Sequence, residues 1–334
     1  MTIANGDVMK LPCMPRLRSV HGWFFLSVVG ILTLLIIAIA NGVQQVRTQA
    51  KNTQCHSNVF FLGHLLLEFG DFYGCLPPPY ISDKLGKPLY SWRVLMLASV
   101  GHGNAPLYEE FDLTKPWDDP TNLKLCKGQD KRSFMLFFAC PTSHPQRLQA
   151  DYFYALSSQD RWPRDFLYDY KSRFRPAHVL LVERQTPEVH WSEPVDVVYE
   201  EPGMKGLLAK IAECKAPHIV GTFCYVSDAA VVTIPPDSTL EYVVQNLKSS
   251  ARMPRSDDAS TKEELARLVA RWMDILGDRN PMAAKYTRQN ALLLLGELGP
   301  TAKAAAPMIR QLLAEEQDAR LKQVAAFALT KIER

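Results

Sequence analysis

The side chains best placed for chemistry are two cysteines and two histidines in the second half of the chain. Cys214, His218 and Cys224 follow one another at short intervals, and His190 could complete a set of four zinc ligands. The alternative is that these residues are buried thiols and surface histidines, which helices and strands often carry without a metal. We favour this alternative, and we predict no catalytic, cofactor-binding or metal-binding residues.

Other candidate sites are weaker. Cys140 with His144 is no better as a pair of metal ligands. Three acidic pairs lack the glycine-containing loop of a calcium site, which favours solvated loops or helix caps: Glu109-Glu110, Asp118-Asp119 and Glu200-Glu201. The sequence contains no phosphate-binding loop, dinucleotide-binding glycine pattern or Gly-x-Ser-x-Gly elbow. It therefore predicts a protein that is not an enzyme, and the alternative is a hydrolase or metal-binding protein with an unrecognised site.

The composition indicates a chain with a substantial core. Its 334 residues are 47% hydrophobic, which suffices for about two domains, and the net charge of +3 gives no strong attraction to nucleic acid. Seven cysteines are too few for a small disulfide scaffold. Cys13 precedes the apolar segment described next, and the other six follow it, so some of these could pair if the body is exported.

The positioning elements begin with an apolar run near the N-terminus. Trp23–Val43 carries no charge, and about 20 helical residues cross a hydrocarbon layer of roughly 30 Å. Residues 1–22 form a leader in which Lys10, Arg16 and Arg18 favour the cytoplasmic side. We therefore predict a single-pass protein of the inner (cytoplasmic) membrane, which binds lipid through this run and has its body on the periplasmic or extracytoplasmic side.

Two alternatives exist for the apolar run. A buried core helix is disfavoured by the length of the run. A cleaved signal peptide is the stronger alternative, because Ala38-Ile39-Ala40 fits a small-x-small cleavage site, although the apolar region is long for such a peptide. In a membrane helix, Ser27 and Thr33 can donate hydrogen bonds to carbonyls of their own helix.

The helix is expected to continue to about residue 72, where Gly74 and Pro77-Pro78-Pro79 end it. One side can pack on the body, through Val46, Ala50, Val59, Leu62, Leu66 and Phe69. The sequence pattern of residues 73–248 predicts an α+β body with an antiparallel sheet. Its expected strands are Phe134–Ala139, Tyr152–Leu156, His178–Val182, Val195–Tyr199, Ile219–Val226 and Ala229–Ile234, with helices at Gly203–Cys214 and Ser238–Leu247.

The region after the apolar run resembles a pilin-like envelope family, domain of unknown function 1559 (DUF1559). Its matching motifs begin with Cys55-x-x-Asn58, Gly63-x-x-Leu66 and Asp71-x-Tyr73-Gly74-x-x-Pro77-Pro78. They continue with Asp83-Lys84-x-Gly86-Lys87-Pro88-Leu89-x-Ser91-Trp92-Arg93-Val94-Leu95, Leu107-Tyr108-x-x-Phe111-x-Leu113, Pro116-Trp117-Asp118-x-Pro120-x-Asn122, Cys140-Pro141 and His190-Trp191-x-x-Pro194. From the residues alone, Trp92 and Trp117 are core anchors, and Arg93 pairs with a carboxylate or carbonyls of the body.

The resemblance implies a fold like type IV pilins or the pseudopilins of type II secretion, with a long N-terminal helix packed on a sheet. In such proteins a basic leader ends at a cleavage glycine, which matches Gly22, and an aromatic residue follows, which matches Trp23. Ser27 stands where those proteins have a glutamate that meets a neighbouring subunit's amine. This departure argues against the usual fibre assembly, and we predict that Gly22 is processed poorly.

The C-terminal tail repeats itself. After a linker at residues 249–258, Arg288–Leu295 corresponds to Lys322–Leu329, a step of 34 residues. Together with the Gly299-Pro300 break, this resembles short HEAT-like repeats of the phycobilisome lyase type, and a plain helical cap is the alternative. We therefore expect a small all-α repeat domain at residues 259–334 that binds protein partners, a scaffolding or assembly role, no nucleic-acid partner and possible homo-oligomers.

Overall fold

The computed structural model describes residues 20–334 apart from several segments. These are residues 99–104, 126–134, 143–148, 168–178, 185–188, 201–203, 214–217, 219, 227–229, 237, 240, 242–257 and 279–283. The chain divides into two compact units, residues 1–50 and 51–334, and each is described by itself. Residues 1–19 of the predicted leader, residues 249–257 of the linker and most of the helix expected at Ser238–Leu247 lie outside the described residues.

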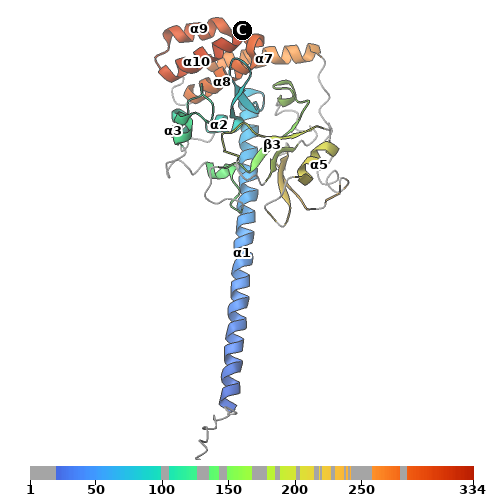
Figure 1. Ribbon diagram of the computed structural model, residues 1–334. Helices are drawn as coiled ribbons and strands as arrows, with labels where there is room; N and C mark the ends of the chain where they lie inside the picture. Colours follow the sequence, from blue (N-terminus) through green and yellow to red (C-terminus); the bar gives the residue numbers. More distant parts are fainter. Residues whose placement is uncertain are drawn as a thin grey trace, which may run out of the picture. The chain divides into compact units, whose positions relative to one another are not determined.

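Helix α1 (Val20–Tyr73) is the longest element of the chain (Figure 1). From Trp23 to Ala50 its side chains are exposed, including Val46 and Ala50, which the periodicity had placed on the packed side. Within the second unit the predicted stripe is confirmed, because Val59, Leu62 and Leu66 are fully buried. Gly74 then adopts φ +82°, a left-handed conformation that suits glycine after a helix, and the helix ends.

The body contains a five-stranded sheet with the order β5-β3-β4-β6-β7. Its strands are β3 (Tyr152–Ser157), β4 (Val179–Glu183), β5 (Val197–Tyr199), β6 (Thr222–Val226) and β7 (Ala230–Ile234). Neighbouring strands are antiparallel except for β3 and β5, which pair in parallel with Ala155 opposite Val197. The predicted antiparallel sheet is therefore corrected to a mixed one, because a strand's side-chain pattern does not state the direction of its neighbour.

The sheet is covered on both faces. Along β6, Phe223 and Tyr225 join the core that includes α1, whereas Cys224 and Val226 face a second core with α5 (Met204–Glu213). This alternation follows from the two-residue period of a strand. The approach of α1 is close, since a Cβ on Gly63 would lie 2.2 Å from Cγ of Tyr225.

The remaining segments of the body are short. Strands β1 (Tyr80–Ser82) and β2 (Pro88–Ser91) form a small antiparallel ribbon, and helices α2 (Trp92–Met96), α3 (Ala105–Glu110) and α4 (Pro120–Leu125) follow. A 3₁₀ turn, η3 (Arg164–Phe166), lies after β3. The strand predicted at Phe134–Ala139 is wrong, because Met135–Phe138 form a 3₁₀ turn, η2. Packing overrides β-propensity there: Phe138 is fully buried and stacks on Trp191 at 6.0 Å between ring centroids.

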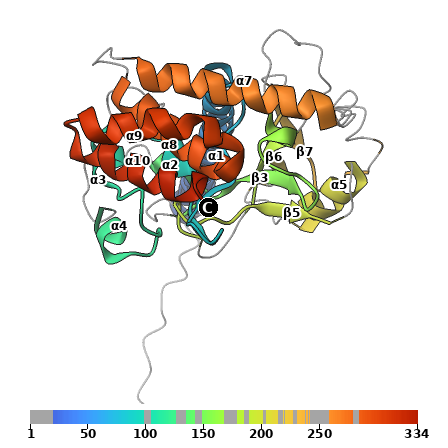
Figure 2. The same ribbon diagram turned by 90° about the horizontal axis from the view of Figure 1, so that it is seen from above.

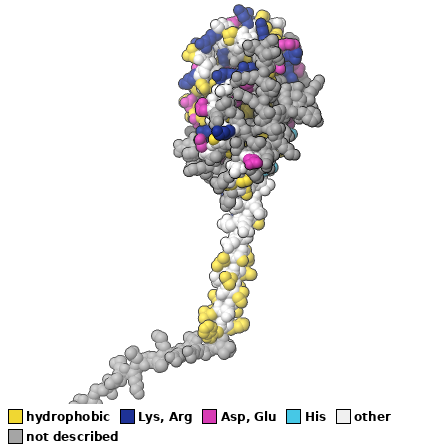
Figure 3. Space-filling view, turned by 90° about the vertical axis from the view of Figure 1, so that its right-hand side faces the viewer, with side chains coloured by type: hydrophobic (Ala, Val, Ile, Leu, Met, Phe, Trp, Pro, Cys, Tyr) yellow, Lys and Arg dark blue, Asp and Glu magenta, His cyan; other side chains and the backbone are white. Residues whose placement is uncertain are grey.

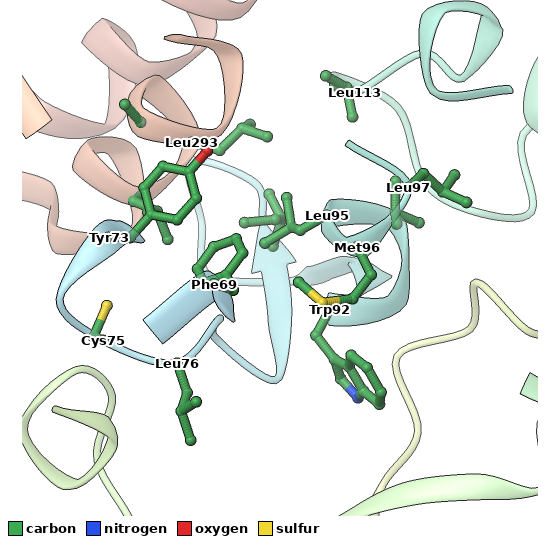
Figure 4. Packing of buried hydrophobic residues seen from close by; sticks show 14 of the residues in the cluster. Phe69, Tyr73, Cys75, Leu76, Trp92, Leu95, Met96, Leu97, Leu113 and Leu293 are labelled. Atoms are coloured by element: carbon green, nitrogen blue, oxygen red, sulfur yellow. The ribbon is translucent and has the colours of Figure 1, made fainter. Parts of the chain in front are cut away.

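The tail consists of α7 (Asp258–Gly277), α8 (Ala284–Leu298), the 3₁₀ segment η4 (Gly299–Ala305), α9 (Ala306–Glu315) and α10 (Ala319–Ile332). These helices pack on one another and on the body (Figures 1 and 2). Figure 4 shows Leu293 of α8 in the same cluster as Phe69, Tyr73 and Trp92. Helices α8 and α10 contain the two copies of the 34-residue repeat, while the HEAT-like assignment stays a prediction.

Candidate functional site

The first part of α1 has an apolar surface that nothing in the described chain covers. Of the described helices, it is the one long and apolar enough to cross a membrane, with a mean hydropathy of 2.7 over its most apolar window. Ile31 and Leu34 are 65% and 68% exposed, and Figure 3 shows hydrophobic side chains along this part of the helix. The hydroxyls of Ser27 and Thr33 donate to the carbonyls of Trp23 and Val29 at 2.9 and 2.8 Å. These features fit a membrane anchor with a body on one side.

A second feature lies inside the body, where four side chains with metal-binding atoms converge. They are Cys55, Cys140, Glu183 and His218, and their ligand atoms all lie within 4.8 Å of one another. Nε2 of His218 is 3.4 Å from Sγ of Cys140 and 3.0 Å from Oε1 of Glu183. The two cysteines and Glu183 are fully buried, and His218 is 5% exposed. We refer to these four residues as the thiol cluster.

Four separate elements bring the thiol cluster together. Cys55 lies on the buried side of α1, Cys140 follows η2, Glu183 ends β4, and His218 precedes β6. The sheet positions Glu183 and His218 near each other, because β4 and β6 are hydrogen-bonded neighbours. The cluster therefore ties α1 to the sheet and to the turn that carries Cys140.

Polar contacts hold the segment that carries Cys140. Its backbone N–H donates to Oδ2 of Asp151 at 2.7 Å. One turn after Cys55 on α1, Nδ2 of Asn58 donates to the carbonyl of Ala139 at 3.3 Å. The motif Cys55-x-x-Asn58 thus supplies both a thiol and an anchor for the residue before the second thiol. Because these bonds are buried, they restrict the cluster to one arrangement.

The protonation of His218 is set by its neighbours. Burial alone lowers the pKa of His218, but its hydrogen bonds with Cys140 and Glu183 outweigh this and raise the pKa to about 9. For Cys140, the hydrogen bond with Cys55, together with burial, raises the pKa of the thiol well above its usual range. At neutral pH His218 is therefore an imidazolium, and the Cys140 thiol beside it is neutral.

This arrangement is unsuited to nucleophilic catalysis. A reactive cysteine needs a thiolate and access for a substrate. Cys140 has neither, because its thiol is fully buried and its pKa is raised. The cluster can instead bind a small ion, since imidazole, thiolate and carboxylate are ligands of transition metals.

The structure separates the residues that the sequence grouped as a possible zinc set. His190 stacks on Trp117 at 5.4 Å between ring centroids, and Cys224 faces the α5 side of the sheet. Cys214 and His144 lie outside the described residues. His218 is buried rather than on the surface, which corrects the alternative that we favoured for it. The partners that the sequence analysis missed are Cys55, which it placed only in a family motif, and Glu183.

Two residues of the acidic pairs accept hydrogen bonds within the fold. Glu109 accepts a hydrogen bond from the hydroxyl of Tyr286 at 2.6 Å, and Asp119 accepts one from the N–H of Thr121 at 2.8 Å. The second contact caps α4.

The expectations for the tryptophan and arginine of the long motif are confirmed. Trp92 is fully buried, and Trp117 is partly buried against the core. The guanidinium of Arg93 donates to the carbonyl of Tyr152 at 2.6 and 3.2 Å and lies 3.5 Å from Asp196. The motif Ser91-Trp92-Arg93 therefore holds β2 and α2 against β3.

Comparison with known proteins gives one match. Residues 44–180 match the family described as "Protein of unknown function (DUF1559)". The DUF1559 segment covers about two fifths of the chain, from the first unit's last residues to the start of β4. It contains Cys55 and Cys140, whereas Glu183 and His218 lie beyond it. No curated protein and no solved structure matches the chain.

Proposed function

We propose that the chain is a single-pass envelope protein of pseudopilin-like build, anchored in the cytoplasmic membrane with its body on the extracytoplasmic side. The observation that carries this proposal is α1 itself. Its residues from Trp23 to Val43 are apolar and exposed, while from Cys55 onward the same helix buries side chains in the core of the body. A long N-terminal helix that is apolar first and then packed on a sheet is the pilin-like arrangement that the DUF1559 resemblance implies.

The role we propose is scaffolding or assembly rather than the formation of an ordinary pilus fibre. Ser27 occupies the place of the expected glutamate, and its hydroxyl is used within its own helix. No carboxylate therefore stands at this position to meet a neighbouring subunit's amine, and a charge buried in lipid without its partner is costly. The helix then serves as an anchor, and the body and the tail make the contacts with other proteins.

The surface we propose for these contacts is the outer stripe of α9. Pro307, Arg310, Gln311 and Ala314 are exposed and follow the spacing of one helix face. The opposite face of α9 is buried, with Ile309 fully enclosed. The stripe therefore presents both apolar and hydrogen-bonding side chains that a protein partner could contact.

Topology is tested by protease treatment of spheroplasts from a bacterium that expresses the full chain with a tag after Arg334. We expect external protease to remove the tag from intact spheroplasts, because the tail lies outside the cytoplasm. A cytoplasmic protein should stay intact in the same sample. If the tag survives until detergent is added, the proposed orientation is wrong.

The tail surface is tested by a photo-crosslinker placed at Arg310 in the full chain. The control carries the crosslinker at Leu85, which is 72% exposed in the β1–β2 turn of the body. We expect a discrete adduct from Arg310, either with a second copy of the chain or with another envelope protein. Equal adduct patterns from both positions would contradict a dedicated surface on α9.

A further inference from the structure

We infer that Cys55, Cys140, Glu183 and His218 form a closed zinc site that fastens α1 to the sheet. This differs from the sequence-based expectation of no metal ligand, and it does not depend on the proposed membrane topology. The inference rests on four observations: the convergence of the ligand atoms, their chemical types, their burial, and the contact that orients the histidine.

The geometry fits a tetrahedral ion. Zinc binds sulfur at about 2.3 Å and nitrogen or oxygen at about 2.0–2.2 Å, which places ligand atoms of one tetrahedron about 3.3–3.8 Å apart. In the thiol cluster Nε2 of His218 lies 3.0 Å from Oε1 of Glu183 and 3.4 Å from Sγ of Cys140, and every pair of ligand atoms lies within 4.8 Å. Shifts of about an ångström or less therefore bring the four atoms to bonding distance from one ion.

The ligand types favour zinc over other metals. Two thiolates and an imidazole are soft or borderline ligands, whereas calcium and magnesium need a shell of oxygens that a single carboxylate does not provide. A carboxylate in the fourth position suits zinc better than copper(I), which prefers sulfur. In the bound state both thiols lose their protons, because metal ions bind the thiolate form of cysteine.

The second ring nitrogen of His218 is already oriented for a metal ligand. Nδ1 lies 2.8 Å from Oδ1 of Asn52, one turn before Cys55 on α1. A carbonyl oxygen accepts a hydrogen bond, so it favours the tautomer with the proton on Nδ1 and the lone pair on Nε2. Histidines that bind metals generally donate their other N–H in this way. The lone pair of Nε2 then faces the two thiols and Glu183.

The burial of the four residues decides the kind of site. A catalytic zinc keeps a position open for water or substrate, whereas a structural zinc has four protein ligands. Here four protein ligands are present and all are buried. The site therefore stabilises the fold, because the ion links four elements that are far apart in the sequence.

The direct test is metal analysis of the full chain, purified in mild detergent with reductant and without added metal. We expect one zinc per chain by mass spectrometry. Replacement by cobalt should give the intense visible absorption of a tetrahedral site and a thiolate-to-cobalt charge-transfer band. Zinc well below one per chain after reconstitution would overturn the inference, as would a disulfide between Cys55 and Cys140 that excludes zinc from the reconstituted protein.

Variants separate zinc ligation from the packing of a buried thiol. Cys140→Ser should abolish zinc binding, while Cys75→Ser, at a fully buried cysteine outside the thiol cluster, should retain it. Because a ligand variant can fail to fold, Asn52→Ala is the second test, since Asn52 is only half-buried. It should fold and bind zinc about 10–100-fold more weakly. Unchanged zinc affinity in Asn52→Ala, or equal zinc loss in both cysteine variants, would contradict the assignment.

Discussion

The ion pair between Lys331 and Glu297 lies within the tail, and its hydrogen bonds with Ser82 join the tail to the body, which gives a quantitative prediction. Nζ of Lys331 donates to Oε1 of Glu297 and, at 2.7 and 3.0 Å, to the carbonyl and hydroxyl oxygens of Ser82 in β1. The N–H and hydroxyl of Ser82 also donate to the carboxylate of Glu297, at 2.8 and 2.9 Å. The side chains of Lys331 and Glu297 are only 7% and 10% exposed. Lys331→Met leaves an unbranched side chain that is one atom shorter and removes its charge.

The loss of stability in Lys331→Met depends on the hydrogen bonds that Glu297 retains. Removing one partner of a buried ion pair typically costs about 3–5 kcal/mol, because the other charge is left without compensation. Here Ser82 still donates two hydrogen bonds to the carboxylate, so we expect the lower end, about 3 kcal/mol. Adding Glu297→Gln to Lys331→Met removes the stranded charge and retains an acceptor for Ser82. The double variant should therefore be about 1–2 kcal/mol more stable than Lys331→Met alone.

The assay is urea unfolding of the full chain in mild detergent, followed by tryptophan fluorescence. Trp272 of α7 reports on tail docking, since it is fully buried and its indole N–H donates to the carbonyl of Tyr73 at 2.8 Å. Lys303→Met, at an exposed lysine in η4, is the control and should change the free energy of unfolding by less than about 0.5 kcal/mol. If Lys331→Met costs less than about 1 kcal/mol, or if Glu297→Gln does not recover stability in its background, the reasoning is refuted.

Three further changes test the packing and the pH response. Gly63→Ala places a methyl group against the ring of Tyr225 and should cost about 3 kcal/mol in urea unfolding, whereas an unaltered unfolding midpoint would rule out the close approach of α1. Burial lowers the pKa of His190 from 6.5 to about 4, so the unfolded state binds the extra proton and stability should fall by about 2.5 kcal/mol from pH 6.5 to pH 4. His190→Gln should flatten that slope. Ala328→Asp buries a carboxylate and should cost several kcal/mol in thermal melting, unlike Ala319→Asp at an exposed position; equal melting would contradict the helix packing.

The elements with strong periodicity were predictable from the sequence. The apolar run and the stripe at Val59, Leu62 and Leu66 identified α1, because a helix repeats its buried side every three or four residues. Five of the six expected strands overlap observed ones, since alternating or continuous β-branched and aromatic residues mark strands. The alanine- and leucine-rich tail gave helices where they were expected.

The features that depend on distant contacts were not predictable. The ribbon of β1 and β2 is too short to show a period, and the turn at Met135–Phe138 follows from packing of its aromatic rings. The thiol cluster draws its residues from four elements, and its nearest pair in sequence is separated by more than thirty residues. Spacing motifs detect ligands that share a helix or loop, so they favoured Cys214 and Cys224 over Cys55 and Glu183.

The membrane anchor is the central claim, and carbonate extraction of membranes from cells that express the full chain tests it most directly. We predict that the chain stays in the washed membranes. Leu32→Arg with Leu35→Arg, in the middle of the apolar run, should release it, because each charge costs about 2.5–3.5 kcal/mol in a membrane helix. Leu85→Arg, at an exposed position of the body, should not. If carbonate releases the unaltered chain, the anchor does not exist.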